Sequence, residues 1–425
     1  MKGWRRIIAI ALFLGAASCA QQPPDSAPSL TPRTFDTFEH RIRVVPVPGL
    51  ARPWALAFLP GGDILITERA GRLRIVRKGV LDPQSISGIP AVVDLRLKGL
   101  NDIAVHPNFA VNKLVYFTYY KPTPGSMNVG TATLARGRFD GGAALADVRD
   151  VFVAEASTIE PSASRIVFGR DGKIYMTIGV PFRGRPAGEV NAEDAQNPSS
   201  HAGKVLRLND DGSVPSDNPF VGRTGYKPEI YALGIRNALG LIVHPVTGEL
   251  WENENGPQGG DEINIIRAGR NYGWPIISYG RAYAGQLEDL SAPSSEVPLA
   301  PGLEQPLLYW VPAIAVSGMT IYTGDRFSAW KGNILVGGLR SAQLQRVVLD
   351  QRGLPAHRES MLTELKLRIR EVRQGPDGFV YLLASRPAKP GTETIHGNRL
   401  SPGQPPVEED DETGVLLRIE PVAGS

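Results

Sequence analysis

The chain has almost no cysteine, little net charge and no long apolar segment. Its 425 residues include a single cysteine, so neither an intramolecular disulfide nor a cysteine-based zinc site can form. The formal net charge of +3 gives no electrostatic footprint for nucleic acid. The longest apolar run, residues 7–17, is too short to span a bilayer. No phosphate loop or dinucleotide fingerprint follows an expected strand, which argues against ATP and nicotinamide chemistry.

The amino terminus has the features of an export signal. Basic residues precede the apolar run and small residues follow it, which is typical of a secretory signal peptide over residues 1–19. Cys19 resembles the lipidated residue of a bacterial lipoprotein signal, although Ala16 occupies a position that is usually leucine. An ordinary cleaved signal is the alternative. Residues 20–34 are rich in Pro, Ser and Gln, and we expect a flexible tether there. The expected location is the periplasm, with a lipid anchor to the cell envelope.

The rest of the chain, residues 35–425, repeats one phrase six times. Each copy has an apolar strand, a polar turn with Gly or Asn, and a second β-rich strand. Each copy has about 64 residues, which suffices for a four-stranded propeller blade and its loops. We therefore predict a single all-β domain, a six-bladed propeller with four-stranded antiparallel blades; a pair of β-sandwiches and a seven-bladed ring are the alternatives. The copies begin at Trp54, Asn101, Ser164, Leu239, Gly318 and Arg370.

Two β-rich segments at the ends of this domain are expected to share one blade. They span residues 41–47 and 414–419, and their pairing would close the ring. Long loops lie near residues 181–201 and 279–303. Because a propeller binds its ligand on such loops at one mouth of the channel, we look for function there.

Arginine side chains follow expected strands at several points. Arg236 and Asn237 stand between a strand and the next blade, where they offer a planar fork of donors and an amide. Arg368 and Arg370 are two residues apart on an expected strand, so both should point to one face. Arg340 also follows a blade strand. Together these groups would form an anion site, whereas surface ion pairs are the alternative.

An acidic segment with glycine and proline spans residues 252–264. Its glycines and proline expose backbone carbonyls, and Asp261 and Glu262 supply carboxylates. Hard oxygen ligands on an irregular loop suit calcium. A solvated acidic turn explains the same composition equally well.

With these residues in view, the chain resembles the soluble aldose sugar dehydrogenases that use pyrroloquinoline quinone, the glucose/sorbosone dehydrogenase family. The resemblance runs from about Pro53 to Ile419, and the family fold is a six-bladed propeller, in agreement with the repeat count. It implies oxidation of an aldose at C1 to the lactone, with electrons passed to an external acceptor. The motifs that carry it are Gly203-Lys-Val-Leu-Arg-Leu208, Asp217-Asn-Pro-Phe220, Gly234-Ile-Arg-Asn237, Asn255-Gly-Pro-Gln-Gly-Gly-Asp-Glu-Ile-Asn264 and Asn271-Tyr-Gly-Trp-Pro275.

The resemblance also implies a role for each matching residue. The cofactor carries three carboxylates, which suits a cluster of guanidinium groups. Arg340 stands where the family often has Lys, which keeps the charge but changes its geometry. Calcium is implied at the carbonyls of Gly256 and Pro257, where it would polarise the quinone, and a second, structural calcium at Glu262 and Tyr272. The implied cofactor-binding set is Arg236, Asn237, Asn255, Asp261, Arg340, Arg368 and Arg370.

The sequence departs from the family at the catalytic base. The histidine that takes the proton from the sugar C1 hydroxyl aligns with Pro161, and proline cannot accept a proton. Glu160 and His201 are the candidate substitutes. A family glutamine that contacts the cofactor or the sugar is Leu97 here. The alternatives left open are a degenerate, non-redox binding propeller and a calcium-dependent hydrolase of the lactonase type.

Overall fold

The structure is a computed structural model of the chain, in which residues 31–425 form one compact unit. It describes residues 31–95, 97–126, 128–156, 163–180, 190–280, 297–386 and 413–422. The predicted signal peptide, Cys19 and most of the predicted tether lie outside these residues, as do Glu160 and Pro161. Within these ranges, no helix has both the length and the apolar character that a membrane crossing needs.

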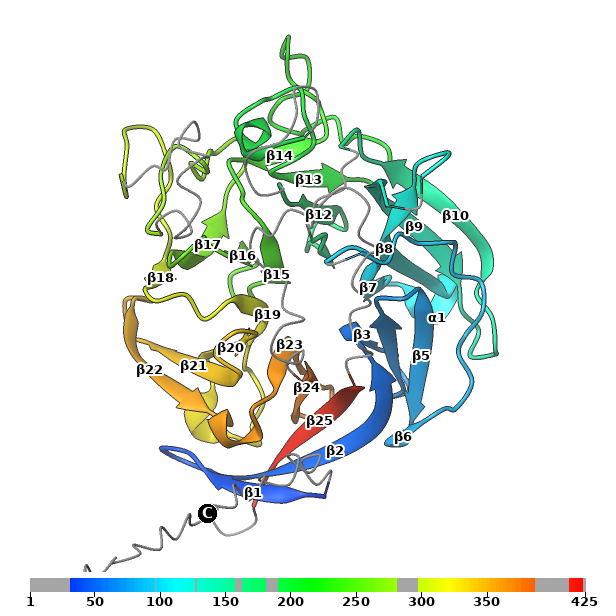
Figure 1. Cartoon of the computed structure of the whole chain (residues 1–425), viewed down its shortest axis with the longest axis vertical. Helices are drawn as coiled ribbons and strands as arrows, with labels where there is room; N and C mark the ends of the chain where they lie inside the picture. Colours follow the sequence, from blue (N-terminus) through cyan, green and yellow to red (C-terminus); the bar gives the residue numbers. More distant parts are fainter. Residues whose placement is uncertain are drawn as a thin grey trace, which may run out of the picture. The chain divides into compact units, whose positions relative to one another are not determined.

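Six antiparallel β-sheets form a ring around a central axis (Figure 1). This arrangement confirms the predicted six-bladed β-propeller and excludes the sandwich and seven-bladed alternatives. Five blades have four strands each, and the closing blade has five. In five blades the chain starts with the innermost strand and runs outward before it crosses to the next blade, whereas in the closing blade the last three strands of the chain run outward and its first two strands form the outer edge.

The strands of the six blades are short. Blade 1 contains β3 (Pro53–Phe58), β4 (Ile64–Glu68), β5 (Arg72–Arg77) and β6 (Val80–Leu81). Blade 2 contains β7 (Leu100–Val105), β8 (Leu114–Pro122), β9 (Gly130–Arg138) and β10 (Ala146–Val153), with α1 (Phe109–Asn112) before β8. Blade 3 contains β11 (Ile166–Phe168), β12 (Ile174–Ile178), β13 (Lys204–Leu208) and β14 (Ile230–Leu233), with the 3-10 turn η1 (Ala192–Ala195) before β13.

The second half of the ring has the same plan. Blade 4 contains β15 (Ala238–Val243), β16 (Leu250–Glu254), β17 (Asp261–Ile266) and β18 (Leu308–Trp310). Blade 5 contains β19 (Val316–Ile321), β20 (Ile334–Gly338), β21 (Gln343–Leu349) and β22 (Pro355–Met361), with η3 (Ser328–Trp330) inside the blade and η4 (Thr363–Leu365) after it. Blade 6 contains β23 (Arg368–Gln374), β24 (Val380–Ser385), β25 (Thr413–Pro421), β2 (Arg41–Ala51) and β1 (Arg33–Asp36).

Blade 6 joins the two ends of the folded unit. The antiparallel pairing of β2 with β25 confirms the ring closure predicted from the sequence. β1 adds an outer strand to β2, so strand structure begins at Arg33, inside the segment predicted as a tether. The turn between β1 and β2 reaches blade 5, where Arg346 donates a hydrogen bond to Glu39 at 2.5 Å. This contact is an additional link across the closed ring.

A hydroxyl on the second strand of a blade connects it to the next blade. Thr67 on β4 accepts from the backbone N–H of Ala55 at 3.0 Å and donates to the carbonyl of Asn101 at 2.6 Å. Thr118 on β8 makes the same two kinds of contact. Its hydroxyl accepts from the backbone N–H of Asp102 in its own blade at 3.0 Å and donates to the carbonyl of Ser164 in blade 3 at 3.1 Å. These contacts satisfy buried backbone groups, which explains the threonine that recurs in the repeats. Apolar clusters fill the space between neighbouring blades.

The innermost strands do not keep a strict two-residue period. Five of them, all except β11, shift register against the second strand near their start. Such a bulge bends a strand and changes where its side chains point. In β23 the extra residue is Arg370, so the spacing of Arg368 and Arg370 does not by itself put both side chains on one face. The bulges contain Trp54, Asp102, Leu239, Ser317 and Arg370.

Candidate functional site

Most of the predicted site residues lie at one end of the ring. Because strands alternate in direction within each blade, the turn after the second strand and the crossing to the next blade are at the same end. We call this end the site rim. The turns after the second strand contain Asn255, Gly256, Pro257 and Arg340, and the crossings contain Arg236, Asn237 and the start of β23 with Arg368.

Arg236 and Asn237 form the crossing from β14 to β15. Arg236 Nη1 donates to the carbonyl of Asn255 at 2.6 Å, and its guanidinium lies 5.1 Å from the ring centre of Trp274. Asn237 Oδ1 accepts from the backbone N–H of Ala163 at 2.9 Å. Both side chains are buried, so these contacts fix them between blades 3 and 4.

Hydrogen bonds connect this crossing to blades 5 and 6. Asn255 Nδ2 donates to the carbonyl of Val316 at 2.8 Å. The next residue, Ser317, donates its hydroxyl to the carbonyl of Ile369 at 2.5 Å. Ile369 stands between the two predicted arginines of β23, so one series of contacts links Arg236 to the start of β23.

The other three arginines differ in burial. Arg340 is exposed, Arg368 is partly buried, and Arg370 is buried with its guanidinium 4.5 Å from the ring centre of Trp54. The Nε of Arg368 is buried and has no hydrogen-bond partner among the residues described. A buried cationic donor left without a partner is costly, and an anion at the rim would satisfy it. Arg368 therefore fits an anionic group, such as a carboxylate, at the rim.

Asp261 holds the turn after β16 against blade 5. Its Oδ1 accepts from the backbone N–H of Gly256 at 2.9 Å, and its Oδ2 accepts from Ile314 at 2.9 Å and Val316 at 3.2 Å. The side chain is 0% exposed. Burial raises the pKa of Asp261, against these backbone N–H groups, which lower it. Both carboxylate oxygens are thus used by the protein, so Asp261 shapes the site through the backbone.

The turn that Asp261 holds is closely packed. A Cβ on Gly256 would lie 2.2 Å from the carbonyl oxygen of Gly259 and 2.4 Å from that of Gly260. Only glycine fits at such a close backbone approach. Several carbonyl oxygens are therefore crowded into this turn, which is the ligand type that calcium takes.

Three glutamates are buried on one face of blade 4. Glu252 and Glu254 lie on β16, and Glu262 on β17 pairs with Glu254. Burial raises the pKa of Glu254 to about 7, against the backbone N–H and the charge of Arg236, which lower it. Burial and the neighbouring carboxylates raise the pKa of Glu252 and of Glu262 well above the usual value. The alternative of a solvated acidic turn is therefore excluded.

Two acceptor atoms in this cluster have no hydrogen-bond partner in the described part of the chain, Glu252 Oε1 and Asn264 Oδ1. Asn264 Nδ2 donates to Glu262 at 3.0 Å. Within the same part of the chain, no three His, Cys, Asp or Glu side chains form a metal-binding group. The hydroxyl of Tyr272 donates to the carbonyl of Ile265 at 2.7 Å. A cation near Glu262 would therefore need amide and carbonyl oxygens as well as carboxylates.

His201 is buried between the outer strands of blades 2 and 3. Its Nδ1 accepts from the backbone N–H of Glu155 at 3.0 Å, and its Nε2 lies 3.6 Å from Glu229 Oε2. The ring centres of His201 and Phe152 on β10 lie 5.2 Å apart in an edge-to-face arrangement. These contacts do not fit the predicted role of substitute base at the ligand. Leu97, at the position of the family glutamine, packs on the apolar cluster of blades 1 and 2.

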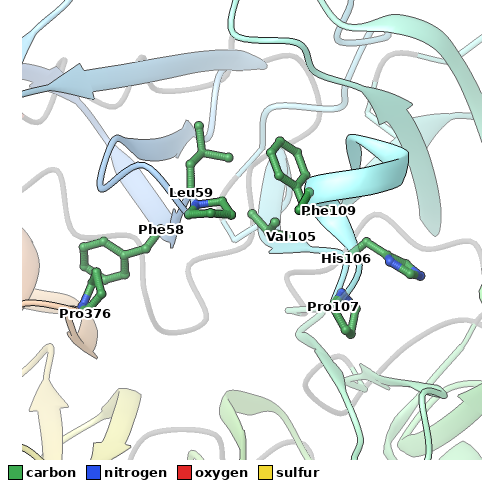
Figure 2. Close-up of a pocket in the computed structure, with 9 residues that line it drawn as sticks. Phe58, Leu59, Val105, His106, Pro107, Phe109 and Pro376 are labelled. Atoms are coloured by element: carbon green, nitrogen blue, oxygen red, sulfur yellow. The ribbon is translucent and has the colours of Figure 1, made fainter.

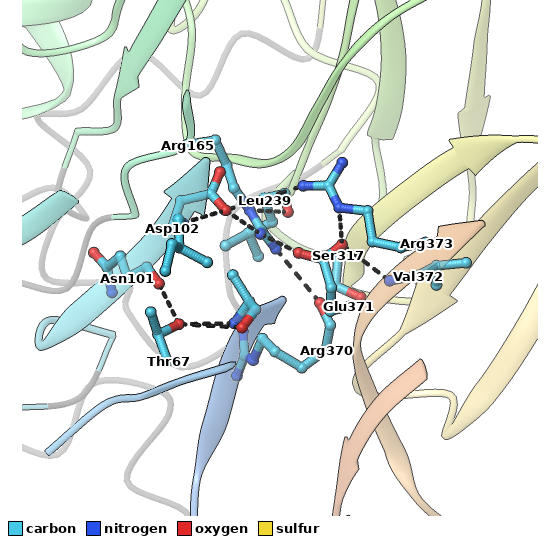
Figure 3. A network of polar contacts seen from close by, with 12 residues as sticks. Thr67, Asn101, Asp102, Arg165, Leu239, Ser317, Arg370, Glu371, Val372 and Arg373 are labelled. Carbon is cyan, nitrogen blue, oxygen red and sulfur yellow. Dashed lines mark hydrogen bonds and ion pairs between the residues drawn. The ribbon is translucent and has the colours of Figure 1, made fainter. Parts of the chain in front are cut away.

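A buried ion network at the centre of the ring was not anticipated from the sequence (Figure 3). Arg165 Nη1 lies 2.5 Å from Glu371 Oε2 and 3.4 Å from Asp102 Oδ1. Burial opposes the charge on Arg165, but the two carboxylates outweigh it and raise the pKa of Arg165. The three residues come from three blades, so local patterning could not bring them together. The sequence signal that could have indicated this network is a charged residue near the start of each of three inner strands.

A pocket of 370 Å³ lies at the opposite end of the ring (Figure 2). It is formed at the turns between the first and second strands of blades 1, 2 and 6, and includes Phe58, Leu59, Val105 and Phe109. Three prolines, one histidine and one alanine complete its described lining. Because the described lining contains no arginine or lysine, the pocket does not suit a tricarboxylate.

The fold and the site rim define a six-bladed propeller with a basic site. Residues 50–391 match the family model described as glucose/sorbosone dehydrogenase. The chain belongs to this family, as the sequence motifs predicted. It is 38% identical to the aldose sugar dehydrogenase YliI of Escherichia coli over 79% of this chain and 87% of that protein.

Two further relatives carry a quinone in their names or titles. The chain is 28% identical to the quinoprotein glucose dehydrogenase B of Acinetobacter calcoaceticus, over 83% of this chain and 87% of that protein. Its structure is similar to the PQQ-bound aldose sugar dehydrogenase of Streptomyces coelicolor, with a TM-score of 0.63, 25% identity and coverage of 89% of this chain and 98% of that one.

Proposed function

We propose that the chain is a quinone-dependent sugar dehydrogenase that oxidises an aldose at C1 to the lactone and passes the electrons to an external acceptor. The observation that carries the proposal is the basic site rim, where arginines of different blades are linked by hydrogen bonds through Asn255 and Ser317. Membership of the family and the PQQ-bound relative support the cofactor assignment.

The chain's own residues would bind and orient the cofactor. Arg368 and Arg370 would bind carboxylates, and the exposed Arg340 would close the anion site from blade 5. Arg236 and Asn237 are held by their hydrogen bonds to Asn255 and Ala163 and would contact the quinone. When bound, pyrroloquinoline quinone supplies a two-electron acceptor for the sugar.

The proposal includes two calcium sites. The turn at Gly256 and Pro257 would supply carbonyl oxygens beside the cofactor, and Asp261 would keep that turn in place. The second site would lie near Glu262 and Tyr272, where the acceptor atom Glu252 Oε1 is buried without a partner among the described residues. Bound calcium would favour the ionised form of the buried glutamates.

Oxidation of the C1 hydroxyl also needs a proton acceptor. We assign this role to Glu160, because both ring nitrogens of the other candidate, His201, face residues next to the outer strands of blades 2 and 3. A second candidate function, cofactor binding without sugar oxidation, is favoured by Pro161 at the position of the family histidine. Sugar-dependent dye reduction by the parent protein separates the two. If the parent oxidises sugar, replacement of Glu160 by Gln should lower turnover at least about a hundredfold if Glu160 is the base.

The site residues lead to a direct test of the proposal. Purified protein is titrated with pyrroloquinoline quinone and calcium, and cofactor absorbance and dye reduction with several aldoses are recorded. The double variant Arg368→Ala/Arg370→Ala should lose quinone binding while the protein stays folded. The control Arg352→Ala removes an exposed arginine bound to Asp350 in a turn at the opposite end of the ring. Unchanged quinone affinity in the double variant would refute the anion site.

The location of the protein is part of the proposal. Export to the periplasm with lipidation at Cys19 would keep the enzyme at the cell envelope. Replacement of Cys19 by Ser should move the protein from the membrane fraction to the soluble periplasmic fraction. If the variant and the parent fractionate alike, the signal is an ordinary cleaved one.

A further inference from the structure

Arg165 sits at the centre of the ring and contacts most of its blades. The side chain is 0% exposed and belongs to blade 3. Its Nε donates to the carbonyl of Leu239 in blade 4 at 2.7 Å, and its Nη1 contacts Glu371 in blade 6 and Asp102 in blade 2. Its guanidinium lies 5.9 Å from the ring centre of Trp54 in blade 1. One side chain therefore connects five of the six blades.

The charges around Arg165 are balanced and closely paired. Asp102 and Glu371 are both fully buried. Arg373 is the second cation, 3.4 Å from Glu371 and 4.0 Å from Asp102. Asp102 also accepts from the backbone N–H of Ile166 at 2.9 Å. Because buried carboxylates are costly without a cation, loss of Arg165 would force this group of residues to rearrange.

The same contacts reach the predicted cofactor arginine Arg370. Arg165 Nη2 donates to the carbonyl of Arg370 at 3.5 Å, and the next residue, Glu371, holds the other guanidinium nitrogen. Arg165 and Arg370 also share the indole of Trp54, at 5.9 and 4.5 Å from its ring centre. Figure 3 shows Arg165, Arg370 and Glu371 gathered at this point.

These contacts act at the bulge in β23. Arg370 is the extra residue of this bulge, between the pairs Ile369–Ala384 and Glu371–Leu383, and a bulge bends a strand and changes where its side chains point. The contacts from Arg165 in blade 3 and Trp54 in blade 1 therefore act on the residue whose direction the bulge sets.

The geometry points to Arg165 as a positioning residue for the anion site: it holds the bulge of β23 so that Arg370 is oriented to bind a carboxylate of the cofactor. This role rests on the proposed function, and it adds a residue that lies below the site rim and would not touch the ligand.

The test compares Arg165→Lys and Arg165→Met with a matched control. Arg207 on β13 is also buried and pairs with Asp171 and Asp217, but it lies in the third strand of blade 3, away from the axis. Arg207→Lys should therefore lower the thermal midpoint to a similar extent without changing quinone affinity. Arg165→Lys should weaken quinone binding by roughly tenfold to a hundredfold, as the loss of supporting contacts does at other sites, and Arg165→Met by more.

Hydrogen exchange gives a readout that does not depend on the cofactor. In Arg165→Lys, peptides that cover residues 367–374 should exchange faster, whereas the same peptides in Arg207→Lys should match the parent. If Arg165→Lys does not fold, the isosteric Glu371→Gln variant, which removes the main partner of Arg165, should show the same local increase in exchange.

The outcomes separate the two proposals. If the parent binds quinone and Arg165→Lys binds it equally well, the positioning role is wrong and the proposed function stands. If the parent does not bind quinone, the proposed function is wrong. Exchange at residues 367–374 then still decides whether Arg165 holds this strand, and unchanged exchange there would overturn the inference.

Discussion

The buried glutamates of blade 4 predict an unusual pH dependence of stability. In the folded protein Glu254 keeps its proton up to a pKa of about 7, whereas in the unfolded chain the pKa is near 4.5. Between these values the folded state binds more protons than the unfolded chain. The free energy of unfolding of the metal-free protein should therefore fall as the pH rises, by about 3 kcal/mol between pH 4.5 and pH 8 from this group alone.

Chemical denaturation at several pH values, with chelator present, measures this slope. The Glu254→Gln variant should lose the slope that Glu254 contributes, because its amide oxygen can still accept from Arg236 but does not ionise. The control Glu249→Gln changes an exposed glutamate in the same blade and should behave like the parent. If the free energy of unfolding of the metal-free parent stays constant or rises from pH 5 to pH 8, the raised pKa of Glu254 is wrong. Added calcium should flatten the slope, because a bound cation favours the ionised carboxylates.

Three further changes test other parts of the structure. Asp261→Asn should lower the unfolding free energy by about 2 kcal/mol in denaturant titrations, because an amide NH2 group replaces one carboxylate oxygen and leaves at least one buried backbone N–H without an acceptor. A loss below about 0.5 kcal/mol, the usual size for a surface substitution, would contradict the role of Asp261. Thr118→Val should lower the thermal midpoint, because it leaves the buried N–H of Asp102 and the buried carbonyl of Ser164 without the threonine hydroxyl. An unchanged midpoint would show that this link between blades 2 and 3 does not stabilise the fold. Pro161→His should raise sugar-dependent dye reduction, and an unchanged rate would show that the lost base does not limit activity.

The repeat made the architecture predictable. Each copy of the strand–turn–strand phrase became the first two strands of a blade, because its alternating residues face two neighbouring blades and its turn residues suit a hairpin. The closure between residues 41–47 and 414–419 followed from the same reasoning. β1 and its link to Arg346 were missed, since a four-residue strand has little sequence pattern of its own.

The site was only partly predictable. Arg236, Arg340 and Arg368 fall at turns or crossings of the same kind, so their place at one end follows from blade topology. The orientation of Arg370 did not follow, because it depends on a bulge that periodicity does not reveal. Burial of Glu252 and Glu254 was also missed, because an acidic composition suggests a solvated turn when the strands that contain it are unknown.

A crystal structure of the protein with pyrroloquinoline quinone and calcium tests the central claim most directly. We expect electron density for the quinone at the site rim, in contact with Arg236 and with its carboxylates in contact with Arg368 and Arg370. Density in the pocket around Phe58 and Phe109, or quinone binding in solution with no density near these arginines, would contradict the account.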